Sequence, residues 1–194
     1  IILDCNGNTL DGDDSGYDYG VNNLGYENVT VKNCVITDFY AGVRFQTNAD
    51  NGIVINNSIS SNLFEGITFG SSDGGLIENN SISDIILGSQ DNGITLHHGS
   101  DLNILRNNSI KDQVKWGIYL HSSSGQNTIL NNHLIDNTEA AIMDLSTADD
   151  NTLIYNNSHG EIRWRPAINL TFINDLDFGT NLDITSNNIY FNTS

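Results

Sequence analysis

Asn79-Asn80-Ser81-Ile82 is one copy of a four-residue motif that returns through most of the chain. Close variants are Asn56-Asn57-Ser58-Ile59, Asn107-Asn108-Ser109-Ile110 and Asn131-Asn132-His133-Leu134. With the second polar position taken as a landmark, successive landmarks are 25, 24, 23, 28, 24, 25 and 30 residues apart. Strand-forming repeats with a period near 24 residues predict a solenoid of stacked coils. The landmarks are Asn8, Asn33, Asn57, Asn80, Asn108, Asn132, Asn157 and Asn187.

Apolar residues keep fixed positions around each landmark and form two rows. The row three residues before the landmark starts with Cys5, Thr30, Val54 and Ile77. The row two residues after it starts with Leu10, Val35, Ile59 and Ile82. A third segment, such as Gly93-Ile94-Thr95-Leu96, alternates apolar and polar residues, which indicates a strand with one buried face. The sequence therefore predicts three short strands in each coil.

The landmark asparagines are expected to be structural. A coil cannot bury its own apolar face, whereas stacked neighbours can. Asparagine tolerates the left-handed backbone of a sharp turn, and stacked asparagine side chains can hydrogen-bond from coil to coil as a ladder. The alternative, in which these side chains bind a ligand, is the less favoured one.

The segments Leu3–Gly12 and Asn92–Leu96 resemble the right-handed parallel β-helix repeat family, which includes NosD-like periplasmic copper-maturation proteins and many surface and polysaccharide-processing proteins. The resemblance covers essentially the whole chain. It implies an all-β fold, a right-handed single-stranded parallel β-helix of about eight coils, forming one domain over residues 1–194. It implies no single chemistry, because the same coils serve lyases, epimerases, adhesins and scaffolds.

The composition is strongly acidic, with 24 acidic residues against 7 lysines and arginines and a formal net charge of −17. Such a surface disfavours nucleic acid, anionic lipid and acidic polysaccharide, since binding a polyanion needs basic contacts. No apolar run approaches the length of a membrane span. The opening Ile1 in place of methionine leads us to expect a processed or longer polypeptide, located outside the cytoplasm at the cell surface.

The two cysteines are predicted to stay apart within one chain. Cys5 lies three positions before its landmark and Cys34 one position after its own. Four positions along a strand span about 13 Å, beyond the roughly 7 Å between Cα atoms that a disulfide allows. Cys5 is therefore expected in the core, and Cys34 on the outside, where it is a candidate for an intersubunit disulfide.

No cofactor is expected from the sequence, with Ca²⁺ as the one alternative. A copper site would need a cluster of cysteine, histidine and methionine, which the sequence lacks; Met143 is the single methionine. Asp11, Asp13 and Asp14 are spaced like the start of a calcium loop, but Asn22 stands where such a loop has a bidentate glutamate. A solvated acidic loop is the competing interpretation.

Outward residues of the third strand form the sharpest candidate site. His97 and His121 should stack about 5 Å apart in neighbouring coils, beside Tyr119. Histidine and tyrosine next to a carboxylate could move a proton on a sugar uronate, with Asp144 and Asp91 as the nearest acids by register. The arrangement resembles active sites of β-helical alginate epimerases and lyases. The competing interpretation is a solvated strand face carrying ordinary polar residues.

Two tryptophans and seven sequons are further candidates for contact with glycans. Trp116 and Trp164 are candidate contacts for a neutral glycan. Seven sequons are present, most of them as by-products of the repeat, and any of them could carry sugar in an organism that glycosylates. Their acceptors are Asn28, Asn56, Asn79, Asn107, Asn156, Asn169 and Asn192.

Neither end of the repeat shows a polar or helical cap, so we expect another coil or another copy to cover each end. The leading interpretation is a non-enzymatic extracellular structural protein that assembles with itself, head to tail, into a sheath, filament or surface layer. One alternative is a secreted carbohydrate-active β-helix, a polysaccharide lyase or uronate epimerase. The other is a glycan-binding domain of an adhesin.

Overall fold

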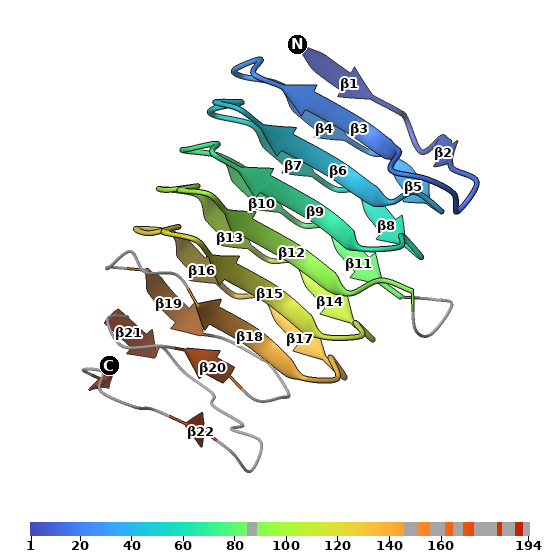
Figure 1. Cartoon of the computed structure of the whole chain (residues 1–194). Helices are drawn as coiled ribbons and strands as arrows, with labels where there is room; N and C mark the ends of the chain where they lie inside the picture. Colours follow the sequence, from blue (N-terminus) through green and yellow to red (C-terminus); the bar gives the residue numbers. More distant parts are fainter. Residues whose placement is uncertain are drawn as a thin grey trace.

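The structure, a computed structural model, describes residues 1–84 and 89–145 in full and five short strand segments beyond them. Those segments are residues 151–155, 162–164, 169–172, 182–183 and 189–191; beyond residue 151 only their backbone is described. Three parallel sheets run along the molecule, and each of the first six coils contributes one strand to each sheet (Figure 1). The predicted all-β parallel β-helix is confirmed. Within the described residues six coils have a strand in all three sheets, where about eight coils were predicted for the chain.

Short strands form sheets A and B. Sheet A contains β1 (Ile2–Asp4), β4 (Thr30–Lys32), β7 (Ile53–Ile55), β10 (Leu76–Glu78), β13 (Ile104–Arg106), β16 (Thr128–Leu130), β19 (Thr152–Tyr155), β21 (Asn169–Phe172) and β23 (Ile189–Phe191). Sheet B contains β2 (Thr9–Asp11), β5 (Val35–Thr37), β8 (Ser58–Ser60), β11 (Ser81–Ser83), β14 (Ser109–Lys111) and β17 (His133–Ile135).

Sheet C is built mainly from six-residue strands and carries the candidate site. It contains β3 (Tyr19–Leu24), β6 (Ala41–Gln46), β9 (Glu65–Gly70), β12 (Asn92–His97), β15 (Trp116–His121), β18 (Ala140–Leu145), β20 (Ile162–Trp164) and β22 (Leu182–Asp183). Among the described residues there is no helix of the length and hydrophobicity that crossing a membrane requires.

The core is one apolar column enclosed by the three sheets. Ile59, Ile82 and Ile110 are fully buried and lie in register in sheet B. In the second coil the predicted rows are shifted by one residue. Val31 and Ile36 occupy the buried positions, in place of Thr30 and Val35. The shift arises because Cys34, and not Asn33, aligns with the buried asparagine of the next coil.

An asparagine ladder runs along the corner between sheets A and B, as predicted. The amide Nδ2 of Asn57 donates to Oδ1 of Asn80 at 3.0 Å, Asn80 donates to Asn108 at 3.0 Å, and Asn108 donates to Asn132 at 2.9 Å. The left-handed turn belongs to the residue before each rung, for example Asn79 with φ 54°. The two roles that the sequence analysis gave to one asparagine are thus divided between neighbours.

The corners on either side of sheet C are tied in the same way. Between sheets C and A, Asn127 Nδ2 donates to Asn151 Oδ1 at 3.2 Å, and the Asn103 amide donates to Asn127 Oδ1 at 2.8 Å. Between sheets B and C, Gln90 links Asn62 to Gln113 through side-chain hydrogen bonds. These bonds pair buried polar groups, which would otherwise cost stability. They tie neighbouring coils together at both ends of the sheet C strands.

Cys5 and Cys34 form an intrachain disulfide, which contradicts the prediction that they stay apart. Their Cα atoms are 4.8 Å apart, and Cys34 is only 1% exposed, so it is not available for an intersubunit bond. The prediction treated the offset between them as distance along a straight strand. The chain instead bends at this corner, where Asn6 and Gly7 are additional residues in the first coil. Cys34 itself occupies the ladder position in place of asparagine.

Candidate functional site

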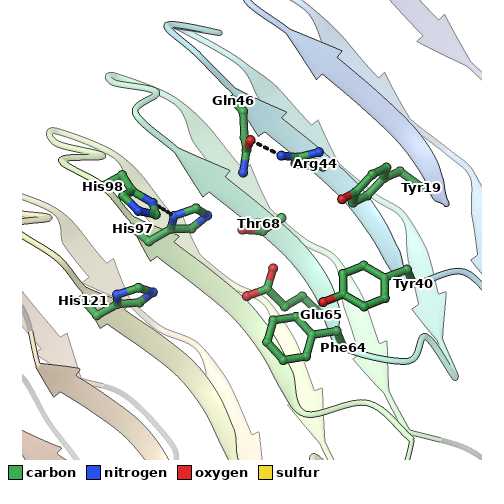
Figure 2. A pocket seen from close by; sticks show the side chains of 10 residues that line it. All are labelled: Tyr19, Tyr40, Arg44, Gln46, Phe64, Glu65, Thr68, His97, His98 and His121. Carbon is green, nitrogen blue, oxygen red and sulfur yellow. Dashed lines mark hydrogen bonds between the residues drawn. The ribbon is translucent and has the colours of Figure 1, made fainter. Parts of the chain in front are cut away.

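A groove with a volume of about 340 Å³ lies on the outward face of sheet C. Figure 2 shows histidines along one side, aromatic rings along the other, and Glu65 and Thr68 between them. The parallel register places Arg44 beside Thr68, and Thr68 beside Thr95, on neighbouring strands of this face. The groove is lined by Tyr19, Tyr40, Arg44, Gln46, Phe64, Glu65, Thr68, His97, His98 and His121.

Glu65 reaches the groove because of the glycine that follows it. A Cβ added at Gly66 would lie 2.7 Å from the carbonyl oxygen of Gly93 and 2.7 Å from Cγ2 of Ile82, so residue 66 faces the core. Ile67 is also buried in the core. Two successive inward residues break the strict alternation of the strand, so Glu65, one position before them, faces outward into the groove. Only glycine fits at position 66.

The Glu65 carboxyl is held in a poorly solvated place. The residue is 8% exposed, and burial raises its pKa to about 7. The hydroxyls of Thr95 and Thr68 and the charge of Arg44 act in the opposite direction but do not outweigh burial. Because the pKa lies close to neutrality, Glu65 can donate or accept a proton under ordinary conditions.

The predicted histidine and tyrosine stack is present. The rings of His97 and His121 have centroids 5.5 Å apart and planes 9° apart, and Tyr119 stacks on His121 at 4.6 Å. Gly70 makes room for the stack, since a Cβ there would lie 2.6 Å from Cε1 of His97. His98, which the sequence analysis did not select, contacts His97 through their Nδ1 atoms.

His97 and His121 are biased toward the neutral form. Burial lowers the pKa of His97 to about 4, and the neighbouring His98, His121 and Arg44 act in the same direction. Burial also lowers the pKa of His121, assisted by His98. A neutral imidazole has one ring nitrogen that accepts a proton or a hydrogen bond.

Arg44 is the cation of this groove. The four other lysines and arginines among the fully described residues each lie within 4.0 Å of a carboxylate. Arg44 has no such partner there; its guanidinium donates to Gln46 Oε1 and lies 4.5 Å from the centroid of the Tyr19 ring. It is therefore free to bind an anionic group in the groove.

Aromatic rings form the opposite wall. Tyr40 and Phe64 stack with centroids 5.5 Å apart, and Tyr17 and Tyr19 meet Tyr40 edge-on at 4.9 Å and 6.1 Å. Burial and then the charge of Glu65 raise the pKa of Tyr40, so its hydroxyl keeps its proton. Rings of this kind provide apolar area with a polar tip, as ligand sites commonly do.

Asp144 does not belong to the site, and its selection by register was wrong. It lies opposite Leu120, on the inward side of β18, and is buried. Its carboxylate accepts a hydrogen bond from Asn151 Nδ2 at 3.1 Å. Asp91 lies immediately before β12 and forms an ion pair with Lys115 at 2.7 Å. Neither carboxylate lines the groove.

The remaining candidates from the sequence are two tryptophans and the acceptors of the sequons. Trp116 packs on Tyr119 with ring centroids 4.1 Å apart, next to the groove. The side chain of Trp164 lies outside the described residues. The acceptors Asn28, Asn56, Asn79 and Asn107 are exposed, whereas Asn156, Asn192 and the side chain of Asn169 lie outside the described part. Glycosylation stays a prediction.

No three histidine, cysteine, aspartate or glutamate residues of the described part converge in a way that could hold a metal ion. Asp11, Asp13 and Asp14 are therefore not gathered into such a group, and calcium binding by them stays a prediction. Instead, the Asp13 carboxylate accepts hydrogen bonds from the backbone amide and hydroxyl of Ser15. Burial, and then the charges of nearby aspartates, raise the pKa of Asp14.

The fold defines the class of protein, a parallel β-helix with a groove on its outward face. Residues 1–162 match the family described as periplasmic copper-binding protein (NosD), and the chain belongs to this family. No curated protein matches the chain.

Solved structures show the same fold. The crystal structure of the periplasmic alginate epimerase AlgG matches with a TM-score of 0.65 and 14% identity, over 95% of this chain and 44% of that one. A double mutant of that enzyme matches with a TM-score of 0.60 and 14% identity, over 89% and 48% of the two chains. The chain thus spans less than half of the enzyme's length, and the likeness shows the fold alone.

The described residues do not fit the copper that the family description implies. Copper sites draw on imidazole, thiolate and thioether ligands. Both cysteines are consumed in the disulfide. The rings of His97 and His121 are stacked nearly parallel, so their nitrogen lone pairs lie in separate planes and do not meet at one point.

Proposed function

We propose that the groove on sheet C binds an acidic saccharide outside the cytoplasm and moves a proton on it, as a uronate epimerase or lyase does. The observation that carries the proposal is Arg44, a cation without a carboxylate partner among the described residues, in a groove that also contains a neutral histidine. An arginine held this way matches the planar carboxylate of a uronate.

The groove supplies the groups that this chemistry needs. A uronate carries a proton on the carbon next to its carboxylate, and charge develops on that carboxylate as the proton leaves. Arg44 would stabilise the charge, and neutral His97 would accept the proton. Tyr40 or Glu65 could return a proton to the same carbon. Return on the opposite face inverts the sugar; loss of the neighbouring glycosidic oxygen instead leaves an unsaturated sugar.

Two observations support a location outside the cytoplasm. The disulfide between Cys5 and Cys34 suits an oxidising compartment. The family and the similar epimerase are both described as periplasmic. The fold likeness to that epimerase supports the proposal only in showing that a β-helix of this kind can carry such a site.

The test uses oligomers of mannuronate, guluronate and galacturonate in deuterated water. We expect deuterium to replace the proton next to the carboxylate, seen by NMR, or an unsaturated product, seen by ultraviolet absorbance. Arg44→Gln should reduce this activity by at least about tenfold. The matched control is Arg106→Gln, because Arg106 lies on sheet A in an ion pair with Glu78. Binding without proton exchange would indicate a glycan-binding domain, and no binding at all would reject the proposal.

End-to-end assembly is the second candidate. In the first coil Ile1, Ile2 and Leu3 are exposed, and β1 pairs with β4 on one side only. Another coil, from this polypeptide or from a second copy, would cover these residues and pair the open edge. Sedimentation of the native protein at several concentrations tests this hypothesis. A single monomeric species at all of them would remove it.

A further inference from the structure

We infer that Glu65 and Thr68 form a hydroxyl-binding subsite in the floor of the groove, which accepts a hydroxyl group of the bound sugar. The inference rests on the proposed function in one respect, that the ligand is a saccharide. It does not require the ligand to be acidic or the protein to be an enzyme.

Thr68 provides the first reason. It lines the groove and is 2% exposed, yet its Oγ1 has no hydrogen-bond partner among the described residues. Thr95, its neighbour on β12, is 1% exposed and in the same condition. A buried hydroxyl without a partner costs stability, and such groups are uncommon in native proteins. The unpaired hydroxyl of Thr68, which lines the groove, points to a polar group that arrives with a ligand.

Glu65 provides the second reason. It lines the same groove, and the influence of both threonine hydroxyls on its pKa shows that they are close to it, although neither is in hydrogen-bonding geometry. A carboxyl group offers oxygen acceptors in both of its forms and a donor when protonated. Together with a threonine hydroxyl, it matches an alcohol, which donates once and accepts as well.

The chemistry of the floor favours an alcohol over an ion. Arg44, one strand from Thr68 in the same outward row, would repel a cation placed there. The Glu65 carboxyl would repel an anion whenever it is ionised. The two positions, Arg44 for a carboxylate and Glu65 with Thr68 for a hydroxyl, lie one strand spacing apart, about 4.8 Å. Substituents of one sugar residue can span such a distance.

The experiment uses neutral disaccharides of glucose, mannose and galactose, which have no carboxylate for Arg44. Thr68→Val removes the hydroxyl and keeps the shape of the side chain. We expect the wild-type protein to bind at least one probe, with NMR shifts at the Thr68 methyl group, and Thr68→Val to bind it about tenfold more weakly. The melting temperature should change little at a pH where Glu65 is protonated, because the Thr68 hydroxyl then has no hydrogen-bond partner to lose. Thr128→Val, on sheet A, is the matched control.

A second substitution separates the carboxyl from the hydroxyl. Glu65→Gln keeps a donor and an acceptor and should retain most of the affinity, whereas Glu65→Leu should lose at least about tenfold. Equal affinity of wild type, Thr68→Val and Glu65→Leu would overturn the subsite, as would the absence of binding of every neutral probe. Failure of the acidic-saccharide proposal gives a different result, in which Arg44→Gln has no effect on uronates while Thr68→Val still weakens neutral sugars.

Discussion

Cys34 occupies the rung of the asparagine ladder next to Asn57: its backbone amide donates to Asn57 Oδ1 at 3.0 Å, as the amides of later rungs do to theirs. Its side chain forms the disulfide with Cys5, where an asparagine side chain would hydrogen-bond along the ladder. The first corner of the β-helix is thus closed by a covalent bond where the others are closed by hydrogen bonds.

Replacing the disulfide by a ladder rung should recover part of its stabilisation. Cys5→Ala with Cys34→Ala removes a link between residues 29 apart, and we expect it to cost about 3–4 kcal/mol of unfolding free energy. Cys5→Ala with Cys34→Asn should regain about 1–2 kcal/mol, because the new amide can donate to Asn57 Oδ1. Urea unfolding measures both. Equal stability of the two double variants would show that the corner does not accept a rung.

A single rung of the ladder should contribute far more to the free energy of unfolding than its exposed neighbour does. Asn80→Ala removes the acceptor of the Asn57 amide groups and the donor to the Val54 carbonyl oxygen, all of them buried. We expect a loss on the order of 3 kcal/mol. Ser81→Ala, at an exposed position of the same corner, should stay within about 0.5 kcal/mol of wild type. Similar losses in both variants would contradict a structural ladder.

The stability of the protein should fall as Glu65 ionises. Its pKa is 4.5 in the unfolded chain and about 7 in the folded protein, so the folded state binds more protons between these values. Unfolding free energy should therefore decrease across this interval, by on the order of 3 kcal/mol relative to Glu65→Gln, which carries no such proton. His97, with a lowered pKa, acts with the opposite sign below pH 6.5. That contribution is common to both proteins, so their difference isolates Glu65. Parallel curves would contradict the raised pKa.

Gly70 should control the environment of His97. A Cβ at residue 70 would lie 2.6 Å from Cε1 and 2.9 Å from Nε2 of that ring, which is the mobile end of a side chain and can swing away. We expect Gly70→Ala to expose the ring and to raise its pKa from about 4 toward the ordinary 6.5, as followed by imidazole NMR titration. Activity on uronates should fall in parallel. An unchanged titration in a folded variant would place the cause of the low pKa elsewhere.

Sequence periodicity predicted the β-helix, the asparagine ladder and the stack of His97 on His121. These features repeat in every coil or follow from strict alternation, so one sequence contains several independent copies of the signal. Asp144 was misplaced because it was chosen by nearness in register; it has the same parity as the inward Ile142 and faces the core. A consistent use of alternation would have excluded it.

Glu65 was missed for the opposite reason. Alternation from Ile67 and Phe69 places residue 65 inward, and the two successive inward residues Gly66 and Ile67 reverse it. The sequence did contain a signal. The positions aligned with Glu65 in neighbouring coils are alanine, asparagine and tryptophan, so an acid at this position departs from its row. The disulfide was missed because the additional residues of the first coil change the path of the corner, which a count along a straight strand does not describe.

The amide ladder also gives the rod a polarity. Each rung donates toward the coil that follows it in the chain, from Asn57 through Asn80 and Asn108 to Asn132, and no rung among these is reversed. Between two rungs the donor always belongs to the earlier coil and the acceptor to the later one, while each Nδ2 also donates back to a backbone carbonyl of the preceding coil, as Asn80 does to Val54. Whole coils can therefore be inserted or deleted in the same orientation without changing the hydrogen-bond pattern of the corner. Two such rods meeting head to head would instead place like groups opposite each other.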